Sequence, residues 1–297
     1  MSLQSRVGAA LSRSVEPAVS AFAEKLAGEA GAMAVLFYGS NLRTGSLEGV
    51  LDFYVLTPGA PEKRLWPTVS YREWEHEGET LRAKIATMTL ARFVAAARGE
   101  TLDTTIWTRF VQPSALVWSR DPLARSQVAS AIEAAAITAA RLAVAVGPDS
   151  GVEAEYWREL FRATYRAEFR VEKPGREDSI LQLNPDHFDG LLPDALAAGG
   201  IPFGRDGAVL TPRITRPEQQ RVQAWWKKRR RLGKPLNIAR LARATRTFDG
   251  AARYAAWKVE RHTGEKIAVT PFREKHPILS APAVAIQLWR AKRRNRD

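Results

Sequence analysis

Cysteine is absent from this chain of 297 residues, so disulfide bonds and thiolate metal sites are excluded. Histidine is scarce, and the HExxH pattern that places two histidines on a zinc ion does not occur. The chain also lacks a Gly-x-Ser-x-Gly elbow and a Walker loop, which leaves hydrolase and P-loop interpretations without support. Carboxylates, hydroxyls and cations remain as the groups that could carry chemistry.

Long apolar stretches are missing as well. We find no run that reaches the roughly 18 to 20 apolar residues of a membrane-spanning helix. The first six residues lack the apolar core of a signal peptide. We therefore expect a cytoplasmic protein that is either soluble or peripheral on the inner face of the membrane.

Acidic residues are depleted in the C-terminal quarter. Residues 221–297 contain 21 Lys and Arg against 5 Asp and Glu, a net charge of +16, whereas residues 1–220 carry −3, which together give the +13 of the whole chain. This imbalance predicts an anionic partner, either nucleic acid or an acidic membrane surface. A solvated basic face is the simpler alternative.

Two apolar runs in the N-terminal third flank a short glycine turn. Residues 33–37 and 50–56 are predicted to be buried strands. Gly39 and Ser40 follow the first run, and a Gly-Ser pair lets backbone and hydroxyl approach a triphosphate closely. Asp52 lies in the second run, where its carboxylate could hold the magnesium ion that bridges phosphates. The alternative is a tight turn between two core strands.

The rest of the chain alternates helical and strand patterns. We expect further strands at residues 81–88 and 115–118. Helices are predicted at residues 3–31, 90–98, 101–110, 121–146 and 153–170, and again from Pro217. The aromatic stripe of the 153–170 helix is most simply a core face, and the Pro- and Gly-rich residues 172–215 are predicted to be mostly loop.

A second block of motifs follows in the middle of the chain. It comprises Ala-Thr-Tyr-Arg-Ala-Glu-Phe-Arg at 163–170, Glu-Asp-Ser-Ile at 177–180 and Phe-Asp-Gly-Leu-Leu at 188–192. This block resembles the Ser-Tyr-x-Gly-Asp-x-Arg, acidic-loop and Phe-x-x-Leu-Tyr pattern of the Tam41 family of phosphatidate cytidylyltransferases.

The N-terminal motifs fit the same family in the same order. Its Tyr-Gly-Ser-Gly and Leu-Asp-Phe motifs resemble residues 38–41 and 51–53. Its Lys-Tyr-Gly-Val-Ile strand resembles residues 84–88, and its Gly-Arg-x-x-Lys-Pro turn resembles residues 108–113. The resemblance covers residues 33–192, and the shared order of the motifs is its main support.

The resemblance implies an α/β (α+β) nucleotidyltransferase domain with a mixed sheet at residues 1–120. A smaller, mainly helical, winged-helix-like domain at 121–220 would complete the active site. From its charge and tryptophans, we expect the basic region 221–297 to bind a membrane surface. The implied activity is phospholipid biosynthesis: transfer of CMP from CTP to phosphatidate or a related phosphorylated lipid, with release of pyrophosphate and Mg²⁺ as cofactor. The product would be of the CDP-diacylglycerol type.

Roles for individual residues follow from the resemblance and from the chemistry of phosphoryl transfer. The predicted catalytic residues are Asp52, Lys84 and Glu168, of which Asp52 and Glu168 would also bind the metal. The predicted nucleotide-binding residues are Tyr38, Gly39, Ser40, Asn41 and Arg109. Arg170 could bind the acceptor phosphate as a planar fork.

Several positions depart from the family pattern. The Gly-Asp pair of the second block is Ala167-Glu168 here, and the lysine of the turn is Gln112. The His-Tyr-Ser segment of the family is not visible. Polymerase-like sites usually carry a second acid two positions after the first, where this chain has Tyr54. The lipid acceptor is therefore left open, and a catalytically inactive relative is an alternative.

The basic region supports two interpretations. Trp225 and Trp226 precede five consecutive cations, and the apolar run 277–289 precedes another basic cluster. Both could lie at a membrane interface, where each cation contributes about 1 kcal/mol, or they could pack against the body of the protein. Stacking of tryptophans on bases beside phosphate-binding cations would instead suit an enzyme or a binding protein that acts on RNA.

Overall fold

The computed structural model describes residues 1–62, 67–167, 176–263 and 268–275. Its main sheet has the strand order β3-β4-β2-β1-β5, with β2 and β4 parallel and the other neighbours antiparallel. The strands are β1 (Ala34–Tyr38), β2 (Leu51–Thr57), β3 (Thr68–His76), β4 (Glu79–Thr89) and β5 (Ser114–Ser119). The predicted α/β class with a mixed sheet is thereby confirmed.

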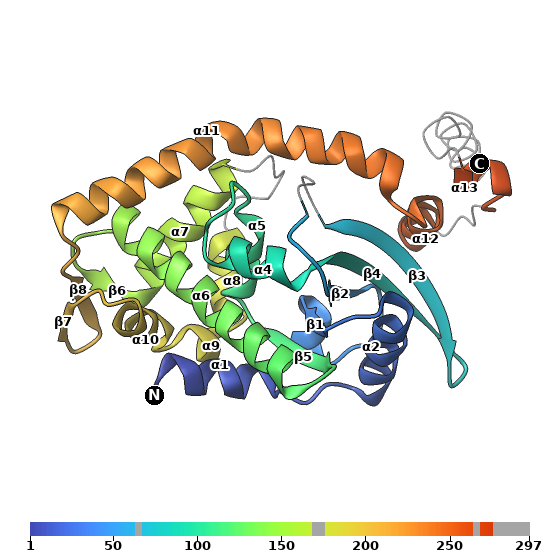
Figure 1. The fold of residues 1–297 in the computed structure, drawn as a ribbon, viewed down its shortest axis with the longest axis horizontal. Coiled ribbons are helices and arrows are strands. Elements are labelled where there is room, and N and C mark those ends of the chain that lie inside the picture. Colours follow the sequence, from blue (N-terminus) through green and yellow to red (C-terminus); the bar gives the residue numbers. More distant parts are fainter. Residues whose placement is uncertain (63–66, 168–175, 264–267, 276–297) are drawn as a thin grey trace, which may run out of the picture.

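Helices make up most of the remaining described chain (Figure 1). They are α1 (Leu3–Leu11), α2 (Pro17–Ala30), α3 (Ser40–Thr44), α4 (Leu90–Ala97), α5 (Thr105–Phe110), α6 (Pro122–Val146), α7 (Glu153–Ala167), α8 (Arg176–Gln182), α9 (Pro185–Phe188), α10 (Leu191–Ala198), α11 (Arg216–Thr247), α12 (Ala251–Thr263) and α13 (Pro271–Lys275). A second, small sheet consists of β6 (Gly151–Val152), β7 (Phe203–Asp206) and β8 (Val209–Pro212).

The two faces of the main sheet are packed by different parts of the chain. Side chains alternate between the faces of a strand, so Phe37 and Phe53 face α2, where Phe22 packs edge-on against Phe53. The opposite face packs against α4, α5 and α6 in a larger hydrophobic cluster. Both faces of the central strands are therefore covered, which explains their nearly continuous apolar sequences.

On the α6 face, the three central strands present three rows of side chains in register. The rows are Ala34, Leu56 and Met88; then Leu36, Tyr54 and Ala86; then Tyr38, Asp52 and Lys84. The first two rows lie within the hydrophobic cluster, with Tyr38 packed at its edge. The third row contains an acid and a base, so the hydrophobic core ends there and a polar site begins.

Helix α6 is the centre of the larger cluster. It is 25 residues long and Ala-rich, and it packs against α1, α4, α5, α7 and α10. By length and composition it could cross a membrane, contrary to our expectation that the chain has no such segment, yet 61% of its most apolar window is buried inside the fold. Alanines let neighbouring helices approach closely, and the burial is that of a core helix.

Three sequence-based predictions of secondary structure were wrong. Residues 3–31 form two helices, because proline disfavours helical backbone in the preceding residue, and Glu16 is extended (φ −56°, ψ 138°). Strand β3 was missed, since its half-exposed pattern is mostly polar. Residues 172–215 contain α8, α9, α10 and the β7–β8 hairpin rather than mostly loop.

The aromatic stripe of α7 is largely a core face, as expected. Tyr156, Trp157, Leu160 and Phe161 are fully buried. The hydrophobic cluster that holds them also includes residues of β1, β2 and β4. A winged-helix-like domain at 121–220 stays a prediction.

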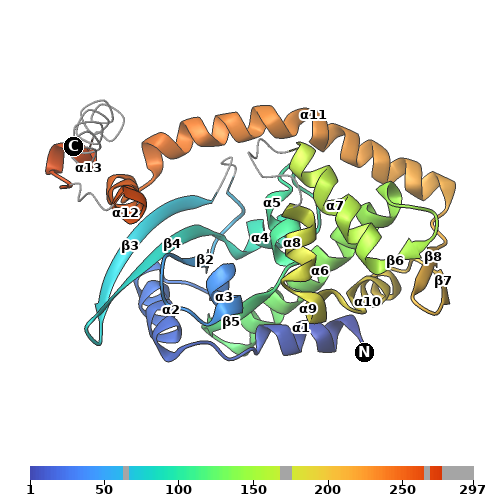
Figure 2. The same ribbon diagram turned by 180° about the vertical axis from the view of Figure 1, so that it is seen from behind.

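The basic C-terminal region begins with a 32-residue helix, α11, that runs along the body of the protein (Figure 2). Trp226 is buried, and the Trp225 indole donates a hydrogen bond to the Gly99 carbonyl (3.0 Å). The Arg229 guanidinium stacks on the Trp225 ring at 3.8 Å and donates to the carbonyls of Gly99 and Thr101. Both tryptophans therefore pack against the body, which was the alternative to an interfacial role. The apolar run 277–289 lies outside the described residues.

A buried ion pair fixes the C-terminal part of α11. Arg240 lies 2.6 Å from the carboxylate of Asp103, and both side chains are at most 10% exposed. Asp103 also accepts hydrogen bonds from the backbone amide (2.8 Å) and hydroxyl (2.5 Å) of Thr105, the first residue of α5. Burial by itself would raise the pKa of Asp103, but Arg240 and Thr105 together hold it below the ordinary value of 3.8.

We expect Arg240→Met to destabilise the protein by about 3 to 5 kcal/mol at pH 7, because it leaves a buried carboxylate without its partner. A lowered aspartate pKa contributes stability that is complete above pH 3.8 and is lost as the pH falls through the folded-state pKa. The difference from wild type should therefore shrink below pH 3.8. Urea unfolding at several pH values measures it, and a difference that is constant with pH would contradict the role of Asp103.

Candidate functional site

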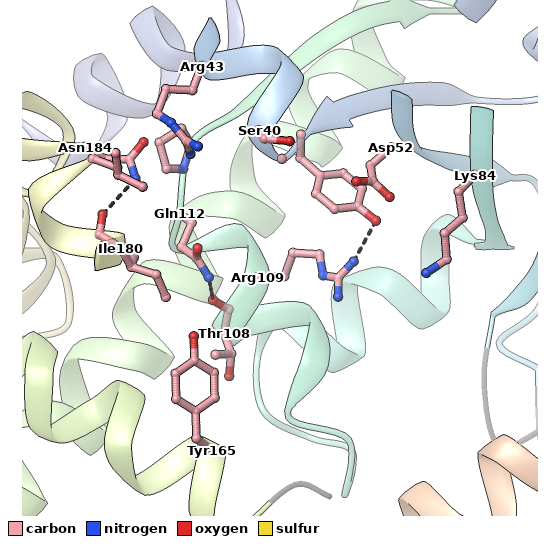
Figure 3. A pocket seen from close by; sticks show the side chains of 14 residues that line it. Ser40, Arg43, Asp52, Lys84, Thr108, Arg109, Gln112, Tyr165, Ile180 and Asn184 are labelled. Carbon is pink, nitrogen blue, oxygen red and sulfur yellow. Dashed lines mark hydrogen bonds between the residues drawn. The ribbon is translucent and has the colours of Figure 1, made fainter. Parts of the chain in front are cut away.

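The polar third row opens into a cleft of about 370 Å³ between the sheet and helices α3, α5, α7 and α8 (Figure 3). Its walls combine the end of β1, the start of β2 and the middle of β4 with residues far apart in the sequence. The lining residues are Tyr38, Gly39, Ser40, Arg43, Asp52, Lys84, Thr108, Arg109, Gln112, Pro113, Tyr165, Ile180, Leu183 and Asn184.

Gly39 makes the sharp exit from β1 possible. Its φ of +93° with ψ of −162° is a conformation that residues with a side chain rarely adopt. A Cβ atom at this position would lie 3.1 Å from the Oδ2 atom of Asp52. Glycine thus allows the backbone to turn directly over the carboxylate, and it places Ser40 at the mouth of the cleft as the first residue of α3.

Asp52 and Lys84 are neighbours on parallel strands. Because they occupy the same register position of β2 and β4, their side chains leave the sheet on the same face. Burial raises the pKa of Asp52, while Lys84 and Arg109 act in the opposite direction. Burial likewise lowers the pKa of Lys84, and Asp52 counteracts it. Each charge is therefore stabilised mainly by the other charges of the site.

Arg109 reaches the same space from α5. The buried side chains of Trp107 and Phe110 anchor this short helix. The guanidinium donates a hydrogen bond to the Tyr38 hydroxyl (2.6 Å) and lies over the rings of Tyr38 (4.8 Å) and Tyr54 (5.9 Å). Burial by itself would lower the pKa of Arg109, but the two tyrosines and Asp52 raise it. Arg109 is thus a fixed positive charge, and Figure 3 shows it converging with Asp52 and Lys84.

The opposite end of the cleft is less charged. There, Arg43 of α3 faces residues of α7, α8 and the loop that follows α8 (Figure 3). The Asn184 amide donates to the Ile180 carbonyl (2.8 Å), and the Gln112 amide donates to the Thr108 carbonyl (3.0 Å). A cation, amides and aliphatic side chains suit a ligand with both an anionic and an apolar part.

The cleft brings together six of the residues that we singled out from the sequence. They are Tyr38, Gly39, Ser40, Asp52, Lys84 and Arg109. Asn41 is buried instead, and its amide donates to the backbone carbonyls of Ser46 and Glu48 (2.8 Å each), so it holds the loop before β2. Glu168 and Arg170 lie outside the described residues.

Sequence reasoning missed several residues of the cleft. These are Arg43, Thr108, Gln112, Pro113, Tyr165, Ile180, Leu183 and Asn184. All of these except Arg43, Leu183 and Asn184 belong to the motifs that carry the family resemblance, so their motif membership was an available signal. Arg43 lies one helical turn from Ser40, but the sequence contains no pattern that separates it from a surface cation.

Whether the cleft could hold the predicted Mg²⁺ ion depends on its acidic side chains. Among the residues that the structure describes, no group of three or more histidines and acids could hold a metal ion. Mg²⁺, however, commonly binds through one or two carboxylates together with phosphates of the substrate. Asp52 faces the open cleft and fits the single protein ligand of a Mg²⁺ ion that enters with a nucleotide.

Comparison with known proteins adds no assignment: no protein-family model and no curated protein matches this chain. The chemistry of the cleft therefore rests on its geometry. One carboxylate, two buried or half-buried cations and a glycine turn with an exposed serine surround a space large enough for a phosphorylated ligand.

We expect Gly39→Ala to cost about 1 to 3 kcal/mol of stability through backbone strain and to weaken ligand binding, because the new Cβ crowds Asp52. Gly31→Ala is a matched control: Gly31 also has a positive φ (+57°), but a Cβ added there would have nothing within 4 Å, and the residue ends α2. Thermal unfolding and nucleotide titration compare the two. Equal losses of binding in both variants would contradict a specific role for the Gly39 turn.

Proposed function

We propose that the protein is a nucleotidyltransferase that transfers CMP from CTP to phosphatidate or a related phosphorylated lipid. One observation supports this most strongly: Gly39-Ser40, Asp52, Lys84 and Arg109 line a single cleft. Phosphoryl transfer requires positioned cations and one or two metal-binding acids more than it requires covalent chemistry from the protein. This arrangement meets that requirement with few residues.

The nucleotide would enter the charged end of the cleft. Ser40 and the exposed backbone at Gly39 would contact its phosphates, as the glycine turn leaves room for them. Lys84 and Arg109 would offset the negative charge that develops on the leaving pyrophosphate. Arg109 is suited to this task because Tyr38 and Tyr54 hold its guanidinium in one orientation.

Asp52 would hold Mg²⁺ jointly with the phosphates of the nucleotide. The ion supplies charge neutralisation and orientation of the phosphates. In the absence of nucleotide, Lys84 and Arg109 balance the Asp52 carboxylate electrostatically. A triphosphate would recruit the same two cations, and this leaves the carboxylate available for the metal.

The acceptor would occupy the end near Arg43. Its phosphate oxygen attacks the α-phosphorus of CTP while the bond from that phosphorus to the bridging oxygen of the β-phosphate breaks, so a new diphosphate forms and pyrophosphate leaves. Arg43 would contact the acceptor phosphate, and Ile180 and Leu183 would contact an apolar portion. A phosphorylated lipid has both features.

The outer face of α11 supports an anionic membrane as a partner. With Trp225, Trp226 and Arg229 turned inward, the exposed cations left on this stretch of helix are Lys227, Lys228, Arg230, Arg231 and Lys234. Leu232 (40% exposed) and Ile238 (56% exposed) lie among or just beyond them. Cations interspersed with aliphatic side chains favour a lipid surface. Because both tryptophans face the body of the protein, they are not available to stack on the bases of a nucleic acid. This weakens the alternative that the protein acts on RNA.

A catalytically inactive nucleotide-binding relative is the second candidate. Tyr54, at the position of a second acid, is buried between aromatic rings and cannot serve as a metal ligand. Binding of CTP without release of pyrophosphate in the presence of any phosphorylated lipid would favour this candidate.

A screen of nucleoside triphosphates against phosphorylated lipids with Mg²⁺ tests the proposal, with pyrophosphate release as the readout. We expect Asp52→Asn to lower the rate by about 100-fold or more, since it removes the metal-binding charge at the reacting centre. Asp206→Asn, an exposed acid in the β7–β8 hairpin, is the matched control and should retain full activity. Turnover that survives the Asp52 change would remove this residue from the mechanism.

We expect the double variant Lys228→Ala, Arg231→Ala to bind anionic vesicles about tenfold or more weakly, because each lost cation contributes about 1 kcal/mol at such a surface. The charge-preserving variant Lys228→Arg, Arg231→Lys should bind like wild type. Vesicle flotation at fixed ionic strength measures both. RNA binding together with indifference to anionic vesicles would contradict the lipid proposal.

A further inference from the structure

Helix α12 lies beside β3 (Figures 1 and 2). Tyr71 of β3 is the register partner of Lys84, so the polar row extends from β2 through β4 to β3. The ring of Tyr254 in α12 packs on Tyr71 with 5.4 Å between centroids. The helix therefore begins directly over the end of this row.

The other end of α12 approaches the loop that leads into β2. A Cβ atom on Gly49 would lie 3.0 Å from a guanidinium nitrogen of Arg261, so the two residues are in close contact. Gly49 precedes Asp52 by three residues. Helix α12 thus extends from Tyr71 to the approach of Asp52, and Lys258 lies between these two contacts, one helical turn from each.

Several contacts fix α12 in this position. The Tyr71 amide donates to the Asp249 carbonyl (2.8 Å), and Arg72 pairs with the Asp249 carboxylate (2.8 Å). Gly250 approaches the Tyr71 carbonyl so closely that a Cβ there would lie 2.6 Å from the oxygen. Arg82, two residues before Lys84, lies over the Trp257 ring at 5.9 Å. The helix is anchored along its length rather than loosely attached.

Two exposed cations of α12 lie beside the aromatic rings that anchor it. Lys258 lies 6.0 Å from the Tyr254 ring centroid, and Arg261 lies 5.4 Å from that of Trp257. Lys258 lies one helical turn after Tyr254, whose ring packs on Tyr71, the register partner of Lys84. The positive charges that surround the single carboxylate of Asp52 repel one another. A multivalent anion would relieve this repulsion.

We propose that Lys258 and Arg261 bind the terminal phosphates of a nucleoside triphosphate at the Lys84 end of the cleft. The C-terminal region would then complete the nucleotide site as well as face the membrane. This inference rests on the proposed function for the identity of the nucleotide, but the site for a polyphosphate can be tested independently. The two side chains are exposed, so a ligand can reach them without rearrangement of the core.

The test compares three probes by calorimetry: inorganic tripolyphosphate, CTP and CMP, each with Mg²⁺. For the variant Lys258→Ala, Arg261→Ala we expect binding of tripolyphosphate and CTP to weaken by about tenfold or more, as two charge-assisted contacts are lost. CMP lacks the terminal phosphates, so its affinity should stay within about twofold of the wild-type value. Circular dichroism checks that the variant is folded.

Two further variants make the result specific. Lys258→Arg, Arg261→Lys keeps the charges and should bind tripolyphosphate nearly as well as wild type. Lys228→Ala, Arg231→Ala removes two cations from the outer face of α11 and should leave tripolyphosphate binding unchanged. An equal loss in this second variant would show that only the overall charge matters, which would overturn the site.

The outcomes separate the inference from the proposed function. Undiminished tripolyphosphate binding by the Lys258, Arg261 double alanine variant overturns the inference, as does a wild-type protein that does not bind tripolyphosphate. Loss of tripolyphosphate binding in the variant, with no release of pyrophosphate from any triphosphate by the wild type, supports the polyphosphate site and overturns the transferase proposal.

Discussion

The position of one charged row at the end of the hydrophobic core is the constraint on which the rest of the structure depends. Three strands in register place Tyr38, Asp52 and Lys84 directly after two buried, mainly apolar rows. A half-buried carboxylate is costly unless it is paired. The surrounding elements therefore have to supply compensating charge at this point, and Lys84 of β4 and Arg109 of α5 supply it.

The cation from α5 depends on a chain of contacts that begins in the C-terminal quarter. Arg240 of α11 pairs with Asp103, and Asp103 in turn binds the first residue of α5. Arg109 lies at the other end of this short helix. A six-residue helix has little intrinsic stability, so its position is set by tertiary contacts. The basic region thus contributes to the site indirectly, by fixing the helix that carries Arg109.

The features that could be predicted from the sequence are those with a strong local signal. Strands β1, β2, β4 and β5 and helices α4, α6 and α7 lie where apolar periodicity placed them, because burial imposes that period. Strand β3 was not predicted, because it lies at the sheet edge, where few side chains are buried.

In the site, Gly39, Ser40 and Asp52 could be predicted because a glycine turn and a strand acid have a fixed local spacing. Their convergence with Lys84 follows from strand register, which local sequence does not specify. Arg43 meets the residues of α8 only through packing between distant segments, and no pattern within either segment encodes that encounter.

The C-terminal quarter shows why net charge alone predicts so little about function. Within the described part of this quarter, cations occur in three settings that composition cannot distinguish: Arg229 and Arg240 are buried against the body, the cations of the outer face of α11 are solvated, and Lys258 and Arg261 lie on α12. A buried cation needs carbonyl or carboxylate partners, and burial lowers the pKa of Arg229 to about 10 despite them. A solvated cation acts at long range and is screened by salt. A cation beside other cations is most stable with an anion bound. The separation of these roles is achieved by the three-dimensional path of α11 and α12, so the function of each charge is a property of the fold.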